Sequence, residues 1–244
     1  MKIAILSDIH GNLEALESVA DSCDELWVLG DLVNYGPDPA AVVEFVRRHA
    51  NLVVRGNHDH AIGFGEDPRC SPAFREPARV MQSYTESMLS AEQKAWLREL
   101  PLTAEREIAG TRFFLCHAVP SDPLFRYSAA ERAFWEPETA AVNADVLLTG
   151  HTHLPFILDL GSRRVVNPGS VGQPKHGRPE ACYAVWDDGD LTLQARRYEV
   201  DATIGKLLGL LIDEAIRRRL AEVLRSGSST TADPGAWPAP SRSH

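Results

Sequence analysis

Residues 2–12 read KIAILSDIHGN, a short apolar run that ends abruptly in polar side chains. Residues 2–6 have the composition of a buried strand. The segments that follow continue an alternation of helix and strand: a helix at 13–20, a strand at 26–29, a helix at 39–49 and a strand at 52–54. This alternation predicts an α/β fold with partly parallel strands.

The rest of the chain adds strands and three helical regions. Further strands are expected at 112–116, 145–148 and 163–166, followed by a hairpin of 181–186 and 191–198 closed by Asp187-Asp188-Gly189-Asp190. Helices are expected within 66–105, where Ser90 and Gln93 form a capping box, at 128–135, where Ser128 and Glu131 repeat that pattern, and at 203–225.

These segments predict one domain over residues 1–225. Residues 66–105 interrupt the strand rhythm, and we interpret them as a helical insertion that either packs on the core or forms a lid over a site. Residues 226–244 are rich in Ser, Thr, Pro and Gly, which offer little to bury, so a disordered tail is expected.

Composition narrows the class of protein. The chain has 244 residues and a formal net charge of −9, which disfavours a broad nucleic-acid surface. Its four cysteines form no CxxC pair, so reduced thiols and a cytoplasmic location are expected rather than a disulfide scaffold. The first apolar run is too short for a signal peptide, and no 18-residue apolar run predicts a membrane span.

Five of the expected strands end in Asp, His or Asn. Ligands of open α/β sheets bind beyond the carboxyl ends of the strands, so side chains far apart in the sequence can converge there. Their types suit a divalent transition metal, and they are too many for a single ion. Two ions about 3.5–4 Å apart need a bridging carboxylate, for which Asp31 is the natural candidate. The residues are Asp8, His10, Asp31, Asn57, His58, His117, His151 and His153.

This ordered set resembles the calcineurin-like metallophosphoesterase superfamily, whose pattern is D-x-H, G-D, G-N-H-D/E, H and G-H-x-H. All five blocks are present in order, within a match that spans residues 3 to about 198. The stretches NPGSVGQP at 167–174 and YGPDP at 35–39 resemble more narrowly the bacterial branch that includes phosphodiesterases of the YfcE type.

The resemblance implies a four-layer α-β-β-α sandwich of two facing mixed sheets. It also implies two divalent transition-metal ions, with manganese preferred and Fe, Ni, Co or Zn as alternatives. One ion would be held by Asp8, His10, Asp31 and His153, and the other by Asp31, Asn57, His117 and His151. A metal-bound hydroxide would attack the phosphorus of a small phosphodiester or phosphomonoester, and His58 would protonate the leaving oxygen.

Several residues near these blocks have open roles. Asn12 either binds a phosphate oxygen or caps the helix that follows, and Tyr35 is a candidate substrate contact. Asn34 and Tyr35 stand where the Ser/Thr phosphatase branch has Asp and Arg, so either another acid orients His58 or His58 is less basic. We interpret Asp59 as a supporting loop group and His60 as a loop histidine.

Two other functions compete with this hypothesis. Diadenosine polyphosphate hydrolysis would need adenine stacking, for which Tyr35, Phe64 and Trp135 are candidates. Some members of the fold have lost catalysis and serve as protein-interaction scaffolds, which typically lose the catalytic His or several metal ligands. Here His58 and every expected ligand remain.

Overall fold

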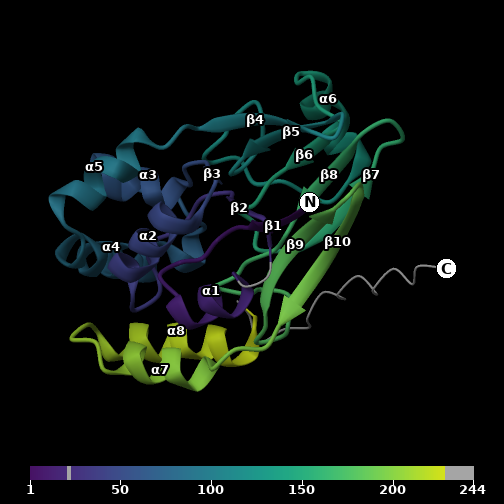
Figure 1. Cartoon of the computed structure of the whole chain (residues 1–244). Helices are drawn as coiled ribbons and strands as arrows, with labels where there is room; N and C mark the ends of the chain where they lie inside the picture. The colour runs from purple at the N-terminus through teal and green to yellow at the C-terminus, as the bar shows by residue number, and fades with distance from the viewer. Residues whose placement is uncertain (21–22, 229–244) are drawn as a thin grey trace.

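The computed structural model describes residues 1–20 and 23–228, which form two mixed sheets with helices outside them (Figure 1). The first sheet has the order β10-β9-β1-β2-β3, and the second has the order β4-β5-β6-β8-β7. The strands of the first sheet are β1 (Lys2–Leu6), β2 (Glu25–Val28), β3 (Leu52–Val53), β9 (Ala181–Asp187) and β10 (Asp190–Arg196). Those of the second are β4 (Thr103–Ile108), β5 (Thr111–Cys116), β6 (Val146–Leu148), β7 (Phe156–Asp159) and β8 (Arg164–Asn167).

The alternation of side chains in β1 explains why the sheets face each other. Ile3 and Ile5 point to one face, where they pack with Phe113 and Leu148 of the second sheet. Ala4 and Leu6 point to the other face, against the first helices. Because both faces of a parallel strand are buried, the strand is apolar at nearly every position.

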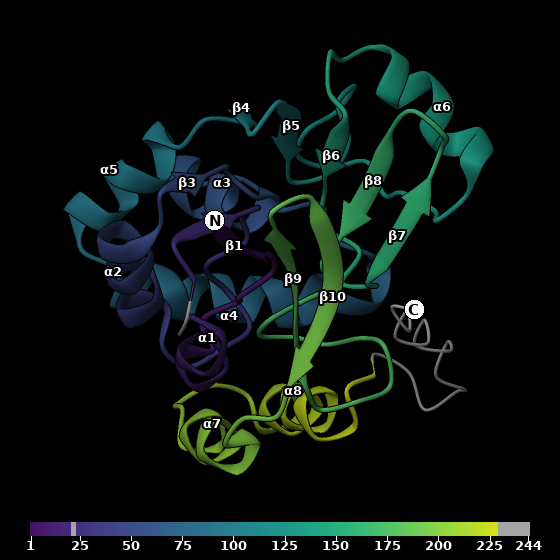
Figure 2. The same cartoon turned by 45° about the vertical axis from the view of Figure 1, so that its right-hand side comes forward.

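Helices cover the outer face of each sheet, as the turned view in Figure 2 shows. α1 (Leu13–Val19) and α2 (Pro39–His49) contribute Leu16 and Val42 to the core on the first sheet. α6 (Arg132–Ala140) buries Trp135 against the second sheet. The four-layer α-β-β-α sandwich expected from the sequence is therefore confirmed.

The region expected to be a helical insertion contains more than helices. α3 (Asn57–Phe64) ends just before it, and the region itself holds the 3₁₀ turn η1 (Pro72–Phe74), α4 (Arg75–Met88) and α5 (Ala91–Glu99). The expected capping box of Ser90 and Gln93 is present at the start of α5. The last residues of the range, however, begin β4, because Thr103–Ile108 pairs antiparallel with β5.

Two expected helices need correction. α6 begins at Arg132 rather than at residue 128, and the Ser128–Glu131 pattern caps nothing, since the buried Trp135 donates to the Ala129 carbonyl and holds that segment outside the helix. The helix expected at 203–225 is two helices, α7 (Val200–Leu208) and α8 (Glu214–Ser226), which pack together at one end of the molecule (Figure 1). Asp213 caps the second helix through the amides of Ala215 and Ile216.

The remaining differences are small. β7, a half-exposed strand with the short apolar run Phe156-Ile157-Leu158, was not predicted. The β9–β10 hairpin turns through Asp188 and Gly189, both at positive φ, as the turn signal predicted. None of the helices in residues 1–20 and 23–228 is long and apolar enough to cross a membrane. The tail expected at 226–244 begins too early, because Ser226 is the last residue of α8 and Gly227 caps it, and from 229 onward it lies outside the described residues. The cytoplasmic location stays a prediction.

Candidate metal centre

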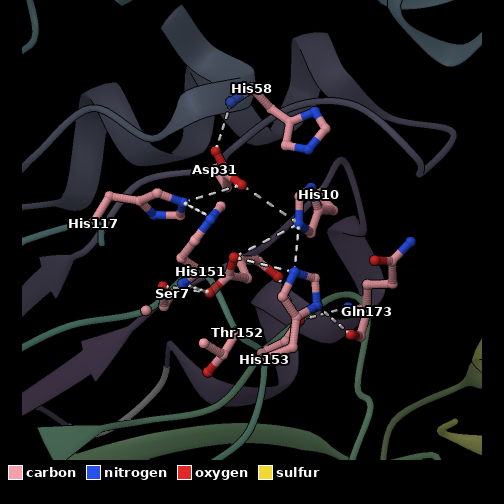
Figure 3. Close-up of polar contacts among 12 residues, drawn as sticks. Ser7, His10, Asp31, His58, His117, His151, Thr152, His153 and Gln173 are labelled. Carbon is pink, nitrogen blue, oxygen red and sulfur yellow. Dashed lines mark hydrogen bonds and ion pairs between the residues drawn. The ribbon is translucent and has the colours of Figure 1, made fainter. Parts of the chain in front are cut away.

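The carboxyl ends of the parallel strands bring the expected metal ligands to one edge of the sandwich. β1, β2 and β3 run parallel in the first sheet, and β5, β6 and β8 run parallel in the second. The loops after these strands therefore face one another. Figure 3 shows the resulting cluster, in which His10, Asp31, His117, His151 and His153 turn toward a common centre.

The backbone at this edge is strained in a consistent way. Left-handed φ values are uncommon in residues other than glycine and cluster where function fixes the backbone. They occur here at five of the expected metal ligands: Asp8, His10, Asp31, His151 and His153. Each of these loops turns sharply after its strand, and the turn directs the side chain across the edge of the sheet.

One group of ligand atoms comes from Asp8, His10 and His153, which lie close enough to hold one metal ion. Nε2 of His153 lies 3.2 Å from Oδ1 of Asp8 and 3.2 Å from Nε2 of His10. Oδ2 of Asp31 is 3.8 Å from Nε2 of His10. The group is buried, since His153 is 3% exposed and Asp8 is fully buried.

The second group is formed by Asp31, His117 and His151. Nε2 of His117 lies 3.3 Å from Oδ2 of Asp31 and 3.2 Å from Nδ1 of His151. Oδ1 of Asn57 lies 3.0 Å from Nε2 of His117 and 3.1 Å from Nδ1 of His151. Asp31 thus faces both groups through the same oxygen, Oδ2.

The hydrogen bonds around the two groups fit bound cations. Nδ1 of His10 donates to the Val33 carbonyl at 3.0 Å, and Nδ1 of His153 donates to the Gln173 carbonyl at 2.6 Å. Because the single proton of each neutral ring is on Nδ1, the two facing Nε2 atoms both carry lone pairs. Oδ1 of Asp8 is buried and accepts no hydrogen bond from the described residues. A divalent cation would satisfy these three atoms together.

The second group has the same design. Nε2 of His151 donates to the Phe125 carbonyl at 3.3 Å, and the Asn57 amide nitrogen donates to the Pro68 carbonyl at 2.6 Å. Nδ1 of His151 and Oδ1 of Asn57 are left facing the centre as acceptors. Nδ1 of His117 likewise donates to the Leu29 carbonyl at 2.8 Å. The carbonyl groups that accept these hydrogen bonds could not be predicted from the sequence, because every residue has a backbone carbonyl.

Electrostatics keep most of these imidazoles neutral. Burial lowers the pKa of His10 and of His151 to about 3, and it lowers the pKa of His153 well below its ordinary value. His117 differs, because the Asp31 carboxylate and its hydrogen bond outweigh burial and raise the pKa of His117 to about 9.

Close backbone contacts fix the loop that carries Asp31 against the start of α3, which carries Asn57. A Cβ on Gly56 would lie 2.1 Å from Oδ1 of Asp31, so only glycine fits there. The Asp59 carboxylate accepts from the amides of Gly56, Asp31 and Leu32 at 3.0, 2.8 and 2.8 Å. Asp59 lies in the first turn of α3 rather than in a loop, and it ties the start of this helix to the loop after β2, as a supporting group would.

His58 lies beside the centre, and Asn34 holds it. The Asn34 side-chain nitrogen donates to the Ala78 carbonyl at 3.2 Å, which fixes the orientation of the amide, and it lies 2.8 Å from Nδ1 of His58. Nδ1 must therefore accept, and the ring proton sits on Nε2. Burial lowers the pKa of His58 to about 4. Of the two alternatives left by the sequence, the less basic His58 is the one that this geometry favours.

The other residues near the metal ligands, whose roles the sequence left open, lie in different environments. Oδ1 of Asn12 caps α1 through the Ala15 amide at 3.1 Å, and its Nδ2 donates to the Gly172 carbonyl at 3.0 Å, so both ends of this side chain are occupied within the fold. Tyr35 is 5% exposed, and its ring packs edge-on to His10 and His58. His60 lies in α3 rather than in a loop, and it faces Glu66 at 3.4 Å, outside the cluster.

A pocket opens onto this centre. Its lining includes Asp31, His58, Tyr127 and Lys175, together with Cys70, Ser71 and Phe74 from the insertion. Tyr127 lies with its ring 4.2 Å from that of His151. Ser7 also supports the site, because its hydroxyl donates to Oδ2 of Asp8 at 2.6 Å (Figure 3). Ser7 was not predicted from the sequence. Its position directly before Asp8, an expected metal ligand, could have indicated this role.

Comparison with known proteins gives this arrangement a family. A model of the calcineurin-like phosphoesterase superfamily domain matches residues 1–189. The chain belongs to this superfamily. The enzyme class expected from the sequence, a metallophosphoesterase, is thereby confirmed.

Individual proteins that are similar to this chain agree with its assignment to the calcineurin-like phosphoesterases. It is 32% identical to a metallophosphoesterase from Sphaerobacter thermophilus, with a TM-score of 0.76 over 93% of this chain and 100% of the other. It is 30% identical to the phosphodiesterase YfcE of Escherichia coli over 80% of this chain and 92% of YfcE. A symmetrical bis(5'-nucleosyl)-tetraphosphatase from Vibrio cholerae is 32% identical over 55% of this chain and 50% of its own length.

Proposed function

We propose that this protein is a dinuclear-metal-dependent phosphoesterase that hydrolyses a small phosphodiester or phosphomonoester. The observation that carries the proposal is the pair of buried ligand groups on either side of Asp31, with acceptor atoms that face one another. Such an arrangement of buried acceptors is costly without a cation between them. Asp31 belongs to the second group, and its Oδ2 lies 3.8 Å from Nε2 of His10 in the first, where it would serve as the bridging carboxylate that a dinuclear site needs.

In this proposal each residue has a definite role toward two divalent cations. Asp8, His10, Asp31 and His153 would hold one cation, and Asp31, Asn57, His117 and His151 the other. Imidazole, amide and carboxylate ligands favour transition metals over Mg²⁺ or Ca²⁺, and manganese remains our preferred candidate within that set. When bound, the cations supply an activated water near neutral pH and charge neutralisation at the phosphate.

His58 would act on the leaving oxygen of the ester. Its Nδ1 accepts from Asn34, so the proton available to a bound substrate is the one on Nε2. His58 would donate a hydrogen bond from this nitrogen to the oxygen that departs. Because its pKa is lowered to about 4, His58 stabilises a departing oxyanion more readily than it transfers a full proton. Esters with acidic leaving groups suit such a site best.

The pocket favours a small substrate. The free space inside it is about 10 Å³, roughly room for one water molecule, so the lining side chains crowd the centre closely. Tyr35 forms part of its wall and would contact the substrate through its edge. The insertion contributes Cys70, Ser71 and Phe74 to the lining, which supports a lid role for this segment.

Diadenosine tetraphosphate hydrolysis is the second candidate, favoured by the likeness to the Vibrio cholerae tetraphosphatase. Two of the expected adenine platforms do not suit it, because Tyr35 is 5% exposed and Trp135 of α6 is buried against the second sheet. Phe64 is 47% exposed, but the Arg55 guanidinium covers its ring at 5.0 Å. We therefore rank this substrate second.

The test is an assay of the metal-reconstituted protein on bis-p-nitrophenyl phosphate, p-nitrophenyl phosphate and diadenosine tetraphosphate. Mn, Ni, Co, Mg and Zn are supplied in parallel. We expect turnover of at least one nitrophenyl ester with a transition metal. An inert protein under every metal would refute it, and turnover of diadenosine tetraphosphate alone would promote the second candidate.

A further inference from the structure

Lys175 lies in the loop between β8 and β9, and its side chain enters the pocket of the proposed metal centre. It is half-buried. Its Nζ lies 5.0 Å from the centre of the Phe74 ring. Within residues 1–20 and 23–228 it makes no hydrogen bond or ion pair.

Other lysines of the chain show what a paired ammonium looks like in this protein. Lys206 forms ion pairs with Glu14 and Asp38. Lys94 donates to the Glu86 carbonyl at 2.5 Å. Both groups are satisfied by the fold itself. Lys175 has only an aromatic face, which is a weak partner for a cation shielded from water.

The charge of Lys175 interacts with charged and titratable residues of the proposed metal centre. Burial lowers the pKa of Lys175 to about 8, whereas the carboxylates of Asp8 and Asp31 raise it. The ammonium in turn lowers the pKa of His58, His151 and His153, which line the same pocket. Lys175 is the only Lys or Arg among the residues that line this pocket.

We propose that Lys175 binds the phosphate of the substrate and selects for phosphate groups that carry two negative charges. The inference rests on the proposed function and deepens it by naming the substrate class, phosphomonoester dianions. A cation without an internal partner, held beside a phosphate-type site, supplies a charge-assisted hydrogen bond to a phosphate oxygen. Coulombic attraction grows with the charge of the bound group, so a monoester dianion gains more from this contact than a diester monoanion.

The test replaces the charge and keeps the bulk, with Lys175→Met, and restores the charge with Lys175→Arg. Lys94→Met is the matched control, because it removes the same charge from α5, outside the pocket. The metal-loaded proteins are titrated with inorganic phosphate by calorimetry, and KM and kcat are measured for p-nitrophenyl phosphate and bis-p-nitrophenyl phosphate. Metal content and thermal denaturation establish that each variant is folded and loaded.

We expect Lys175→Met to bind inorganic phosphate about tenfold or more weakly, the size of one charge-assisted contact. KM for the monoester should rise by a similar factor, and KM for the diester should rise distinctly less. Lys175→Arg should recover most of the phosphate binding, and Lys94→Met should match the wild type. Unchanged phosphate binding in Lys175→Met, or an equal rise of KM for both esters, would overturn the proposal.

Failure of the proposed function can be told apart from failure of this inference. If the wild type turns over neither ester with any metal, the phosphoesterase proposal fails, and the calorimetric titration still measures whether Lys175 binds phosphate. If the wild type turns over either ester and Lys175→Met binds phosphate like the wild type, the phosphoesterase proposal stands and only the role of Lys175 is lost.

Discussion

The side-chain nitrogen of Asn34 lies 2.8 Å from Nδ1 of His58, and the same nitrogen donates to the Ala78 carbonyl. This relationship leaves a single tautomer for the neutral ring, with its proton on Nε2. A carboxylate in the place of Asn34 would accept from Nδ1 and stabilise the imidazolium instead. The identity of one side chain therefore sets whether His58 donates a hydrogen bond or a proton.

The substitution Asn34→Asp tests this account. It should raise the pKa of His58 from about 4 and allow the ring to carry two protons. We expect turnover of an alkyl phosphate, which has a poor leaving group, to increase roughly tenfold and to rise further as the pH falls toward the new pKa. Turnover of nitrophenyl esters should change little, because nitrophenolate departs without a proton.

The matched control for this change is Asn51→Asp, which introduces the same charge at an exposed position where Oδ1 accepts from the Leu26 amide. It should leave both substrates unaffected. Equal effects of Asn34→Asp on alkyl and nitrophenyl esters, at every pH, would show that Asn34 does not act through the proton of His58.

Ser7 is expected to tune metal affinity without contacting the metal. Its hydroxyl donates to Oδ2 of Asp8 at 2.6 Å and so orients the carboxylate. Loss of such a supporting hydrogen bond typically weakens metal binding 10–100-fold, so Ser7→Ala should need about that much more metal for half-maximal loading. Ser18→Ala removes a hydroxyl that only donates to the Ala15 carbonyl. If both variants load like the wild type, Asp8 needs no support from Ser7.

Gly56 is expected to be irreplaceable for steric reasons. Alanine there would place its Cβ 2.1 Å from Oδ1 of Asp31 and force the shared carboxylate to move. We expect Gly56→Ala to lose metal and to lower the free energy of unfolding by about 1–3 kcal/mol. A Cβ at Gly205, on α7, would meet nothing within 4 Å, so Gly205→Ala should be neutral or stabilising. Normal metal loading by Gly56→Ala would contradict the close contact.

Metal removal should destabilise the fold as well as stop activity. Within residues 1–20 and 23–228 no donor reaches Oδ1 of Asp8, and the facing Nε2 atoms of His10 and His153 both carry lone pairs. Because a metal that binds only the folded state stabilises it, chelation should lower Tm by several degrees, and Mn²⁺ should restore it. The Asp31→Asn variant should show a smaller response to the chelator. Identical melting curves with and without chelator would argue against a buried metal site.

Local patterns in the sequence were enough to predict the strands that position the site. The strand ends after residues 6, 28, 53, 116 and 148 carry the polar blocks, and parallel pairing brings them together. The capping box at Ser90 and the turn at Asp188-Gly189 were also readable, because each depends on neighbouring residues alone.

Features that depend on tertiary contacts could not be predicted from the sequence. The break between α7 and α8 follows from the two helices packing on each other. β4 forms because β5 lies beside it, and its own side chains are largely exposed. The tautomer of His58 depends on the carbonyl of Ala78, which no sequence pattern encodes.

The central claim is that Asp31 stands between two metal ions. Titration of metal-free protein with Mn²⁺ by calorimetry, followed by elemental analysis of the desalted complex, measures the number of ions directly. We predict two per chain for the wild type and a loss of at least one for Asp31→Asn. Saturation of the wild type at one ion, or no binding of Mn²⁺, Co²⁺, Ni²⁺ or Zn²⁺, would contradict the account.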